Sequence, residues 1–221
     1  MIITSISMKN ESNNYWNIFY KNKNILSKLN FPSQFAVFTL SEKQNENTVI
    51  EIGCGNGRDS FFFSKYFKNI HAFDKSDNAI KYNRNNYKRV KNLKFYEYDI
   101  NENFEFLRLK KLKKILYARF FLHSLNNNEI LKFINLSSKL INKNEKIFLE
   151  YRVLEDKNSK KIFKKHFRNY LNPQEIAKFF IMNSFKLDYN VVGQGFAKYG
   201  AEDPFVARQI FIKKWFLKKK K

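Results

Sequence analysis

Three glycines at alternate positions form the part of the sequence best suited to bind a ligand. Gly53, Gly55 and Gly57 follow an apolar run, and a helical segment begins near Asp59. Glycine is needed where the backbone turns sharply and must approach a ligand without a Cβ in the way. A strand, a glycine-rich turn and a helix in this order predict a ligand site at the strand end.

Two carboxylates follow the next two apolar segments. Asp74 closes the segment 69–74, and Asp99 follows the segment 93–98. Asp74 can accept hydrogen bonds from both ribose hydroxyls of an adenosine, and Asp99 can take the adenine amino group while Ile100 packs on the ring. Parallel strands end at the ligand-binding edge of an open sheet, so both groups are expected beside the glycine-rich turn.

The elements that must position these residues alternate between strand-like and helix-like patterns. Strands are predicted over 48–53, 69–74, 93–98, 114–119 and 146–151, and helices over 59–66, 76–89 and 127–141. A helix opened by Pro173 then precedes strands over 185–192 and 205–213, which suit an antiparallel hairpin at the sheet edge. The pattern predicts an α/β fold with a mostly parallel sheet of about seven strands, the last one antiparallel, and helices on both faces.

The combined pattern resembles the class I S-adenosylmethionine (SAM)-dependent methyltransferases over almost the whole chain. The resemblance implies a Rossmann-like fold, SAM as cofactor and S-adenosylhomocysteine as product. It implies that the three glycines line the methionine and ribose, that Glu51 positions the amino-acid end, and that Asp74 and Asp99 hold the ribose and adenine. The predicted cofactor-binding residues are Glu51, Gly53, Cys54, Gly55, Asn56, Gly57, Arg58, Asp74, Lys75, Ser76, Asp99, Ile100, Tyr20 and Phe35.

A dinucleotide-binding domain is the alternative for the same turn. NAD would place its pyrophosphate at the N-terminus of the following helix. Asp59 lies there and would repel a phosphate, whereas it tolerates zwitterionic SAM, so SAM is favoured. Cys54, the only cysteine, is interpreted as filling a small slot in the turn, because no basic neighbour in sequence activates its thiol.

The residues before position 42 are predicted to form an N-terminal helical extension, and residues 42–221 the methyltransferase domain. Tyr15, Trp16, Phe19 and Tyr20 have helical spacing in this extension. They are interpreted either as a lid that shields the cationic sulfonium or as core contacts of an added helix, with Tyr20 and Phe35 nearer the ligand.

Shorter segments resemble a bacterial branch of the family that methylates capsule and O-antigen glycans or their terminal phosphates. The matching segments are 15–16, 19–20, 32–36, 53–60, 117–123, 150–152, 166–170 and 202–204 with Arg208. This resemblance implies an O-methyltransferase of cell-surface polysaccharide assembly. Its acceptor would be a sugar hydroxyl or a phosphate or phosphoramidate-like group, carried on a small molecule or a lipid-linked glycan.

Two residues around the end of the fourth predicted strand, His123 and Arg119, are the catalytic candidates. Methyl transfer from a sulfonium is an in-line displacement, for which the enzyme mainly supplies alignment and exclusion of water. A sugar hydroxyl needs a general base, for which His123 is the best candidate, whereas a phosphate oxygen is already ionised and needs only positioning. The alternative role of His123 is that of a cap or packing residue.

Polar and basic residues after the fifth strand form the predicted acceptor site. Convergent guanidiniums can bind a phosphate or carboxylate bidentately, and ordinary surface charge is the alternative. The predicted substrate-binding residues are Arg152, His166, Arg168, Tyr199 and Glu202. No His, Cys and acidic residues have metal-ligand spacing, so no metal is predicted.

The formal net charge of +22 over 221 residues is the strongest signal in the composition. It indicates either a polyanionic partner, such as nucleic acid, an anionic membrane or a phosphorylated glycan, or lysine-rich codon usage spread over solvated faces. The lysines at 218–221 follow Trp215, Phe216 and Leu217 and can rest on anionic lipid. With no signal peptide or membrane span recognised, a cytoplasmic location, including the inner face of the membrane, is expected.

Two other functions stay open. An RNA or DNA methyltransferase would suit the charge and the many rings. However, the fourth strand ends in Tyr117-Ala118-Arg119-Phe120 rather than in the Asn/Asp-Pro-Pro-aromatic motif of amino-group nucleic-acid methylation. A non-catalytic SAM-binding partner protein would retain the same cofactor residues. The oligomeric state is not predicted.

Overall fold

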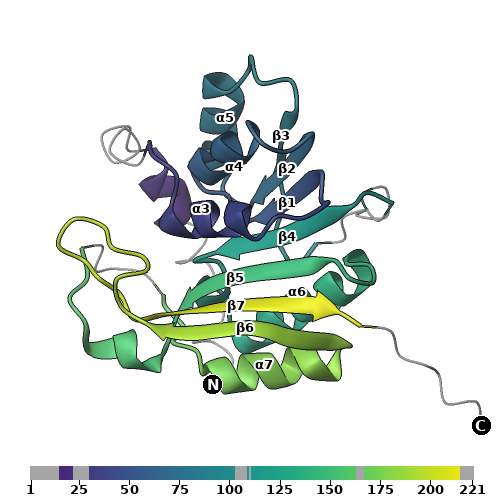
Figure 1. Ribbon diagram of the computed structural model, residues 1–221. Helices are drawn as coiled ribbons and strands as arrows, with labels where there is room; N and C mark the ends of the chain where they lie inside the picture. The colour runs from purple at the N-terminus through teal and green to yellow at the C-terminus, as the bar shows by residue number, and fades with distance from the viewer. Residues whose placement is uncertain (1–14, 22–29, 103–108, 110, 163–166, 215–221) are drawn as a thin grey trace, which may run out of the picture.

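A seven-stranded sheet organises the computed structural model, which describes residues 15–21, 30–102, 109, 111–162 and 167–214 (Figure 1). The strand order is β3-β2-β1-β4-β5-β7-β6. The strands are β1 (Thr48–Ile52), β2 (Asn69–Asp74), β3 (Leu93–Glu97), β4 (Lys114–Arg119), β5 (Lys146–Arg152), β6 (Phe185–Gly193) and β7 (Val206–Lys213). The first five pair in parallel, and β7 runs antiparallel to β5 and β6. The predicted Rossmann-like architecture is confirmed.

Helices cover both faces of the sheet because the side chains of its central strands alternate between two apolar cores. One face carries α3 (Gln34–Ser41), α4 (Arg58–Phe63) and α5 (Asp77–Asn86), and the other carries α6 (Asn127–Leu140) and α7 (Pro173–Met182). Within β4, Ile115 and Tyr117 enter the first core, whereas Leu116 and Ala118 enter the second. Every residue of β1 and β5 is buried, as parallel strands covered on both faces require.

Polar residues just before two helices decide where those helices begin. Asn126 accepts a hydrogen bond from the N–H of Glu129, whose carboxylate accepts one from the N–H of Asn126 in return. Pro173 occupies the first turn of α7 after the capping residue Asn172. Both helix starts agree with the sequence-based prediction.

The described residues before position 42 form two helical segments with different surroundings. Residues 15–19 are helical, and Tyr15, Trp16 and Phe19 among them line the cavity discussed below. In α3, Phe35 and Ala36 are fully buried, so this helix belongs to the core although the sequence assigned it to an extension. In the described part of the chain, no helix has both the length and the apolar character needed to span a bilayer.

Candidate active site

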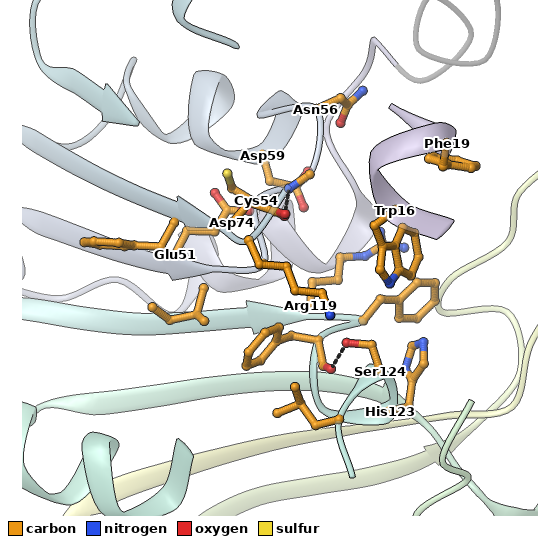
Figure 2. A pocket seen from close by; sticks show the side chains of 18 of the residues that line it. Trp16, Phe19, Glu51, Cys54, Asn56, Asp59, Asp74, Arg119, His123 and Ser124 are labelled. Atoms are coloured by element: carbon orange, nitrogen blue, oxygen red, sulfur yellow. Dashed lines mark hydrogen bonds between the residues drawn. The ribbon is translucent and has the colours of Figure 1, made fainter. Parts of the chain in front are cut away.

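A cavity of about 230 Å³ lies at the carboxyl ends of the parallel strands (Figure 2). The glycine-rich turn after β1 and the ends of β2 to β5 form one part of its wall, and residues 15–20 and the β6–β7 connection complete it. Most of the predicted site residues contribute to this wall. They are Glu51, Gly53, Cys54, Gly55, Asn56, Arg58, Asp74, Lys75, Asp99, Ile100, Tyr20, Arg119, His123, Arg152, Arg168, Tyr199 and Glu202.

Phe35 is not part of the wall, contrary to the prediction. Its ring is fully buried and stacks on Tyr117 with the ring centroids 5.1 Å apart. The helix that carries it packs against the sheet, which directs the ring into the core and away from the cavity. His166, predicted to bind the acceptor, lies outside the described residues.

Ser76 and Gly57 also lie outside the cavity wall, and each has a structural role next to it. The Ser76 hydroxyl caps α5 by accepting a hydrogen bond from the N–H of Ala79. Gly57 has a φ of +71°, and a Cβ there would lie 2.9 Å from Oδ1 of Asn83 and 3.0 Å from the ring of Phe95. Glycine is therefore required at this position for packing against α5 and β3.

The other two glycines of the turn lie in the wall. Gly53 has a φ of +79°, and a Cβ there would lie 2.8 Å from Cδ2 of Phe121. At Gly55 a Cβ would collide with the hydroxyl of Tyr20, whose ring comes from the N-terminal segment. Phe121 and Tyr20 therefore pack closely on the turn, which also faces the cavity, and a Cβ at either glycine would disturb this packing.

Asp74 presents its carboxylate to the cavity in an orientation set by backbone donors. Oδ2 accepts a hydrogen bond from the N–H of Gly55 at 2.8 Å, and Oδ1 accepts one from the N–H of Ser76 at 2.9 Å. Burial raises the pKa of Asp74, and these two hydrogen bonds partly offset that rise. The geometry leaves a fixed acceptor at the end of β2, as a ribose diol requires.

Glu51 and Asp59 are two further acidic residues near the glycine-rich turn. Glu51 accepts a hydrogen bond from Ser60, and burial followed by the nearby Asp59 carboxylate raises its pKa well above the usual range. Asp59 accepts hydrogen bonds from the Ser33 hydroxyl at 2.7 Å and the Tyr117 hydroxyl at 2.8 Å. Asp59 gives the first turn of α4 an acidic character that suits an ammonium group better than a phosphate.

Arg152 lies in the cavity wall at the carboxyl end of β5. Its guanidinium donates to Asp156 at 2.6 Å and to Glu202, and it lies 5.3 Å from the centroid of the Phe120 ring. Arg168 lies in the same cavity wall, and burial followed by the Arg152 guanidinium lowers its pKa. Sequence reasoning placed these two guanidiniums together, and the structure brings both into the cavity wall.

Arg119 is oriented by a carboxylate that the sequence did not single out as part of the site. Its Nε donates to Glu150 Oε1 at 2.8 Å, and Arg208 Nε donates to the other oxygen of the same carboxylate at 2.7 Å. Glu150 is fully buried between them. This pairing across β4, β5 and β7 holds the Arg119 guanidinium at the cavity. The two guanidiniums of Arg119 and Arg208 share the single negative charge of Glu150.

His123 is oriented by the backbone of β5. Its Nδ1 accepts a hydrogen bond from the N–H of Arg152 at 3.3 Å. A neutral imidazole has one acceptor nitrogen and one N–H, so Nε2 carries the proton when Nδ1 is the acceptor. The ring can then donate a hydrogen bond but has no nitrogen left to take up a proton. With this hydrogen bond the ring suits a hydrogen-bond donor better than a proton acceptor, and the general-base role stays a prediction.

Phe120 is a cavity residue that sequence reasoning missed. Its φ of +55° is a genuine outlier for a bulky residue, and its N–H donates to the carbonyl of Glu150 at 2.8 Å. The ring lies 4.3 Å from the Arg119 guanidinium and 5.1 Å from the ring of His123. Such backbone strain persists only where surrounding contacts hold it, and no local sequence pattern signals it for phenylalanine.

The N-terminal segment forms the aromatic side of the cavity. Figure 2 shows Trp16 projecting from it toward the side on which Arg119 and His123 lie. Asn17 ties the segment to the start of α5, because its Oδ1 accepts from the Ser76 hydroxyl at 2.8 Å and its carbonyl accepts from Asn78. This arrangement is compatible with the lid interpretation of the aromatic residues.

Cys54 lies in the wall but is poorly suited to react. Burial, followed by the Asp74 and Glu51 carboxylates, raises the pKa of its thiol well above the usual range. Within the residues that the structure describes, no three His, Cys, Asp or Glu side chains gather as a possible metal site. The absence of a metal stays a prediction.

Comparisons with known proteins agree with this geometry. A sequence profile described as "Methyltransferase domain" matches residues 43–195. A search of curated protein sequences finds no significant match. Among solved structures, a SAM-dependent methyltransferase from Anabaena variabilis has a TM-score of 0.70 at 16% identity, over 91% of this chain and 93% of that chain. The glycopeptide N-methyltransferase MtfA has a TM-score of 0.67 at 11% identity, over 85% of this chain and 99% of that chain.

The structural neighbours differ in the compounds that their names describe. A third one is the magnesium protoporphyrin IX methyltransferase ChlM from Synechocystis, solved with bound SAM, with a TM-score of 0.58 at 12% identity over 81% of this chain and 76% of that chain. At these identities the likeness concerns the fold, whereas the profile match covers more than half of the sequence. The chain therefore belongs to the methyltransferase domain family and is a class I SAM-dependent methyltransferase.

Proposed function

We propose that this enzyme is an O-methyltransferase whose acceptor is an already ionised oxygen, on a phosphate or phosphoramidate group of a bacterial cell-surface polysaccharide or its precursor. The observation that carries the proposal is the hydrogen bond from the backbone N–H of Arg152 to Nδ1 of His123. It supports a role for His123 as a hydrogen-bond donor to the acceptor. An ionised oxygen can accept the methyl group without a general base, so it can react in a site where His123 acts only as a donor.

The residues of the cofactor end fit SAM, which when bound supplies the methyl group on a positively charged sulfur. Asp74 would hold the ribose hydroxyls, and the glycine-rich turn leaves room for the backbone to approach the ligand. Asp99 and Ile100 would face the adenine. Glu51 would face the ammonium of the methionine part. The aromatic rings of the N-terminal segment would exclude water from the sulfonium and favour its charge.

The acceptor end carries guanidiniums that can donate to an anion, with Arg119 paired to Glu150 and Arg152 paired to Asp156 and Glu202. Arg119, Arg152 and Arg168 all line it, and a guanidinium keeps its charge at any physiological pH. The side chains of Arg119 and Arg152 are only 15% and 8% exposed, so their interaction with a bound anion would be weakly screened. These residues would hold the anion in line for displacement, which is the main task of the enzyme when the nucleophile is already ionised.

A hydroxyl acceptor is less well matched to the same wall. It needs a group that takes up its proton during the transfer. Glu202, the nearest acidic candidate to Arg152, already accepts from that guanidinium and from the N–H of Ile162 at 2.8 Å. Both oxygens of this carboxylate are therefore already engaged as hydrogen-bond acceptors within the protein.

The replacement His123→Gln separates the two possibilities. Glutamine retains an N–H donor but cannot take up a proton near neutral pH. With sugar phosphates as acceptors, we expect its kcat to stay within about tenfold of the wild-type value, whereas loss of a general base would lower kcat by roughly 10²–10⁴-fold. The matched control is Ser124→Ala, because Ser124 lies in the same wall and its hydroxyl donates to the carbonyl of Phe121 at 2.6 Å (Figure 2).

The acceptor class is tested with paired compounds. Sugar phosphates, the same sugars without phosphate, and a short RNA would be incubated with the enzyme and SAM, and S-adenosylhomocysteine would be measured. Turnover with the phosphorylated member of each pair supports the proposal. Turnover with the unphosphorylated sugars or with RNA only would overturn it. The assignment to cell-surface polysaccharide comes from the short sequence segments resembling that branch, and glycan phosphates in the panel test it directly.

A further inference from the structure

The last turn of α7 exposes three large apolar side chains. Phe179, Ile181 and Met182 are 37%, 51% and 67% exposed, although the opposite face of the helix buries Ile176 and Phe180 in the core. Single apolar residues at a surface are ordinary, but three within four positions form a local patch. This patch lies at the end of the sheet away from the cavity, where β7 finishes (Figure 1).

Exposed lysines surround this patch because several elements end there. The N–H of Lys214 donates to the carbonyl of Ser184 at 2.9 Å, which joins the end of β7 to the end of α7. Lys213 Nζ donates to Ser138 on α6 at 2.8 Å, and the Lys213 carbonyl accepts from the N–H of Asn144 at 3.0 Å. The exposed lysines on these ends are Lys139, Lys143, Lys178, Lys186 and Lys214.

Acidic residues near this patch do not balance its charge. Glu145 is buried and paired with Lys114 at 2.8 Å, so it faces inward. Asp188 lies 3.6 Å from Lys186 on β6, and Glu175 is exposed on α7, so two carboxylates lie near the five lysines. Beyond Lys214 the sequence continues with Trp-Phe-Leu and then four lysines at 218–221, the same combination of large apolar and basic residues.

We propose that the α7 basic surface, formed by Phe179, Ile181, Met182 and the five lysines named above, binds the surface of an anionic lipid bilayer. The apolar side chains would enter the boundary between headgroups and acyl chains. The lysines would lie among anionic headgroups, which attract basic side chains near the surface. A polyanion in solution, such as RNA, would use the lysines but would have no use for exposed Ile and Met side chains.

This binding mode leaves the cavity accessible. The carboxyl ends of the parallel strands lie at the opposite end of the sheet from the α7 basic surface (Figure 1). The enzyme would therefore be held at the membrane with its active site toward the aqueous side. An acceptor that projects from the membrane or diffuses nearby would reach it, whereas a group at the level of the acyl chains would not. The proposal is independent of which acceptor is methylated.

Sedimentation with vesicles tests this surface on the full chain. Vesicles of phosphatidylcholine alone would be compared with vesicles containing phosphatidylglycerol, at low and high salt. The apolar variant is Ile181→Ser with Met182→Ser, and the charge variant is Lys186→Glu with Lys214→Glu. The matched controls are Leu131→Ser, which is 47% exposed on α6, and Lys88→Glu with Lys91→Glu, which are exposed beyond α5.

We expect salt-sensitive binding that requires phosphatidylglycerol. Each of the two test variants should lower the partition coefficient by about tenfold or more, and each control should stay within about twofold of wild type. SAM affinity should be unchanged in all of them, which reports an intact fold. Equal binding of test and control variants would overturn the proposal. So would loss of binding in the charge variant alone together with equally tight, salt-sensitive binding to RNA, which would indicate general polyanion affinity.

Discussion

On the cofactor side of the cavity, carboxylates are oriented by backbone N–H groups, whereas on the acceptor side arginines are oriented by carboxylates from distant strands and loops. Asp74 accepts from the backbone N–H of Ser76, two positions away, and from that of Gly55 in the turn after β1, 19 positions away, and Asp99 accepts from the N–H of Asn101, two positions away. By contrast, Arg119 pairs with Glu150 across 31 positions, and Arg152 with Glu202 across 50 positions.

The difference has a physical origin and a consequence. A backbone N–H just past a strand end is supplied by the turn itself, so it does not depend on which other side chains the fold brings near. A buried guanidinium needs a carboxylate partner, because an unpaired charge in the interior is costly. The carboxylates that close β2 and β3 therefore depend mainly on backbone turns at strand ends, whereas the acceptor side depends on side-chain pairing between distant elements. The predictions below test that contrast.

The largest effect is expected at the acceptor side, for Arg152→Met. The replacement removes the Arg152 guanidinium from Glu202 and from the fully buried Asp156, which keeps Lys161 at 3.2 Å. Breaking a buried pair in this way costs about 3–5 kcal/mol in the free energy of unfolding. Denaturant unfolding measures it, and SAM affinity at low temperature should change little. Arg89→Met, at an exposed position, is the control and should cost less than about 0.5 kcal/mol. A loss as small as the control would mean that the pairing contributes little.

A large effect on ligand binding, with little effect on folding, is expected for Asp74→Ala. Hydrogen bonds to a charged group contribute about 1.5–3 kcal/mol each, so loss of the ribose contacts should weaken SAM binding by roughly 100-fold. Calorimetry with SAM and S-adenosylhomocysteine measures it. Asp77→Ala, an acidic residue in the first turn of α5, should stay within about twofold. Unchanged affinity in Asp74→Ala would remove this carboxylate from the cofactor site.

The smallest effect is expected for the pH dependence of the stability of the protein without SAM. Burial and the Asp59 carboxylate raise the pKa of Glu51 well above its usual value of 4.5, so the folded state keeps this proton at pH values where the unfolded state has lost it. Stability of the wild type should therefore fall as the pH rises from about 4.5 to the raised pKa. Glu51→Gln should remove that fall and raise the Tm near neutral pH. For a protein of this size, each kcal/mol gained in the free energy of unfolding raises the Tm by about 2–4 °C.

Thermal unfolding of both proteins across that pH range is the measurement. The comparison variant is Glu97→Gln, whose carboxylate is exposed at the end of β3 and should give the same pH dependence as wild type. A Glu51→Gln curve that keeps the wild-type pH dependence would show that another group titrates there.

Sequence patterns alone determined the sheet, its parallel and antiparallel parts, and the cofactor end of the site. Each strand from β1 to β5 was predicted to within one residue at either end, because apolar runs between polar turns are read without knowledge of neighbours. The glycine turn and Asp74 were found in the same way, since both their residue types and their spacing are local.

Only the tertiary structure decided three other features of the site. Phe35 lies in the core because α3 packs on the sheet, which no property of the residue itself indicates. The orientation of the His123 ring depends on a backbone N–H 29 positions away, and the role of Glu150 depends on arginines on both neighbouring strands. These features arise from contacts between elements that are distant in sequence, and a single sequence carries no direct record of which distant side chains will meet.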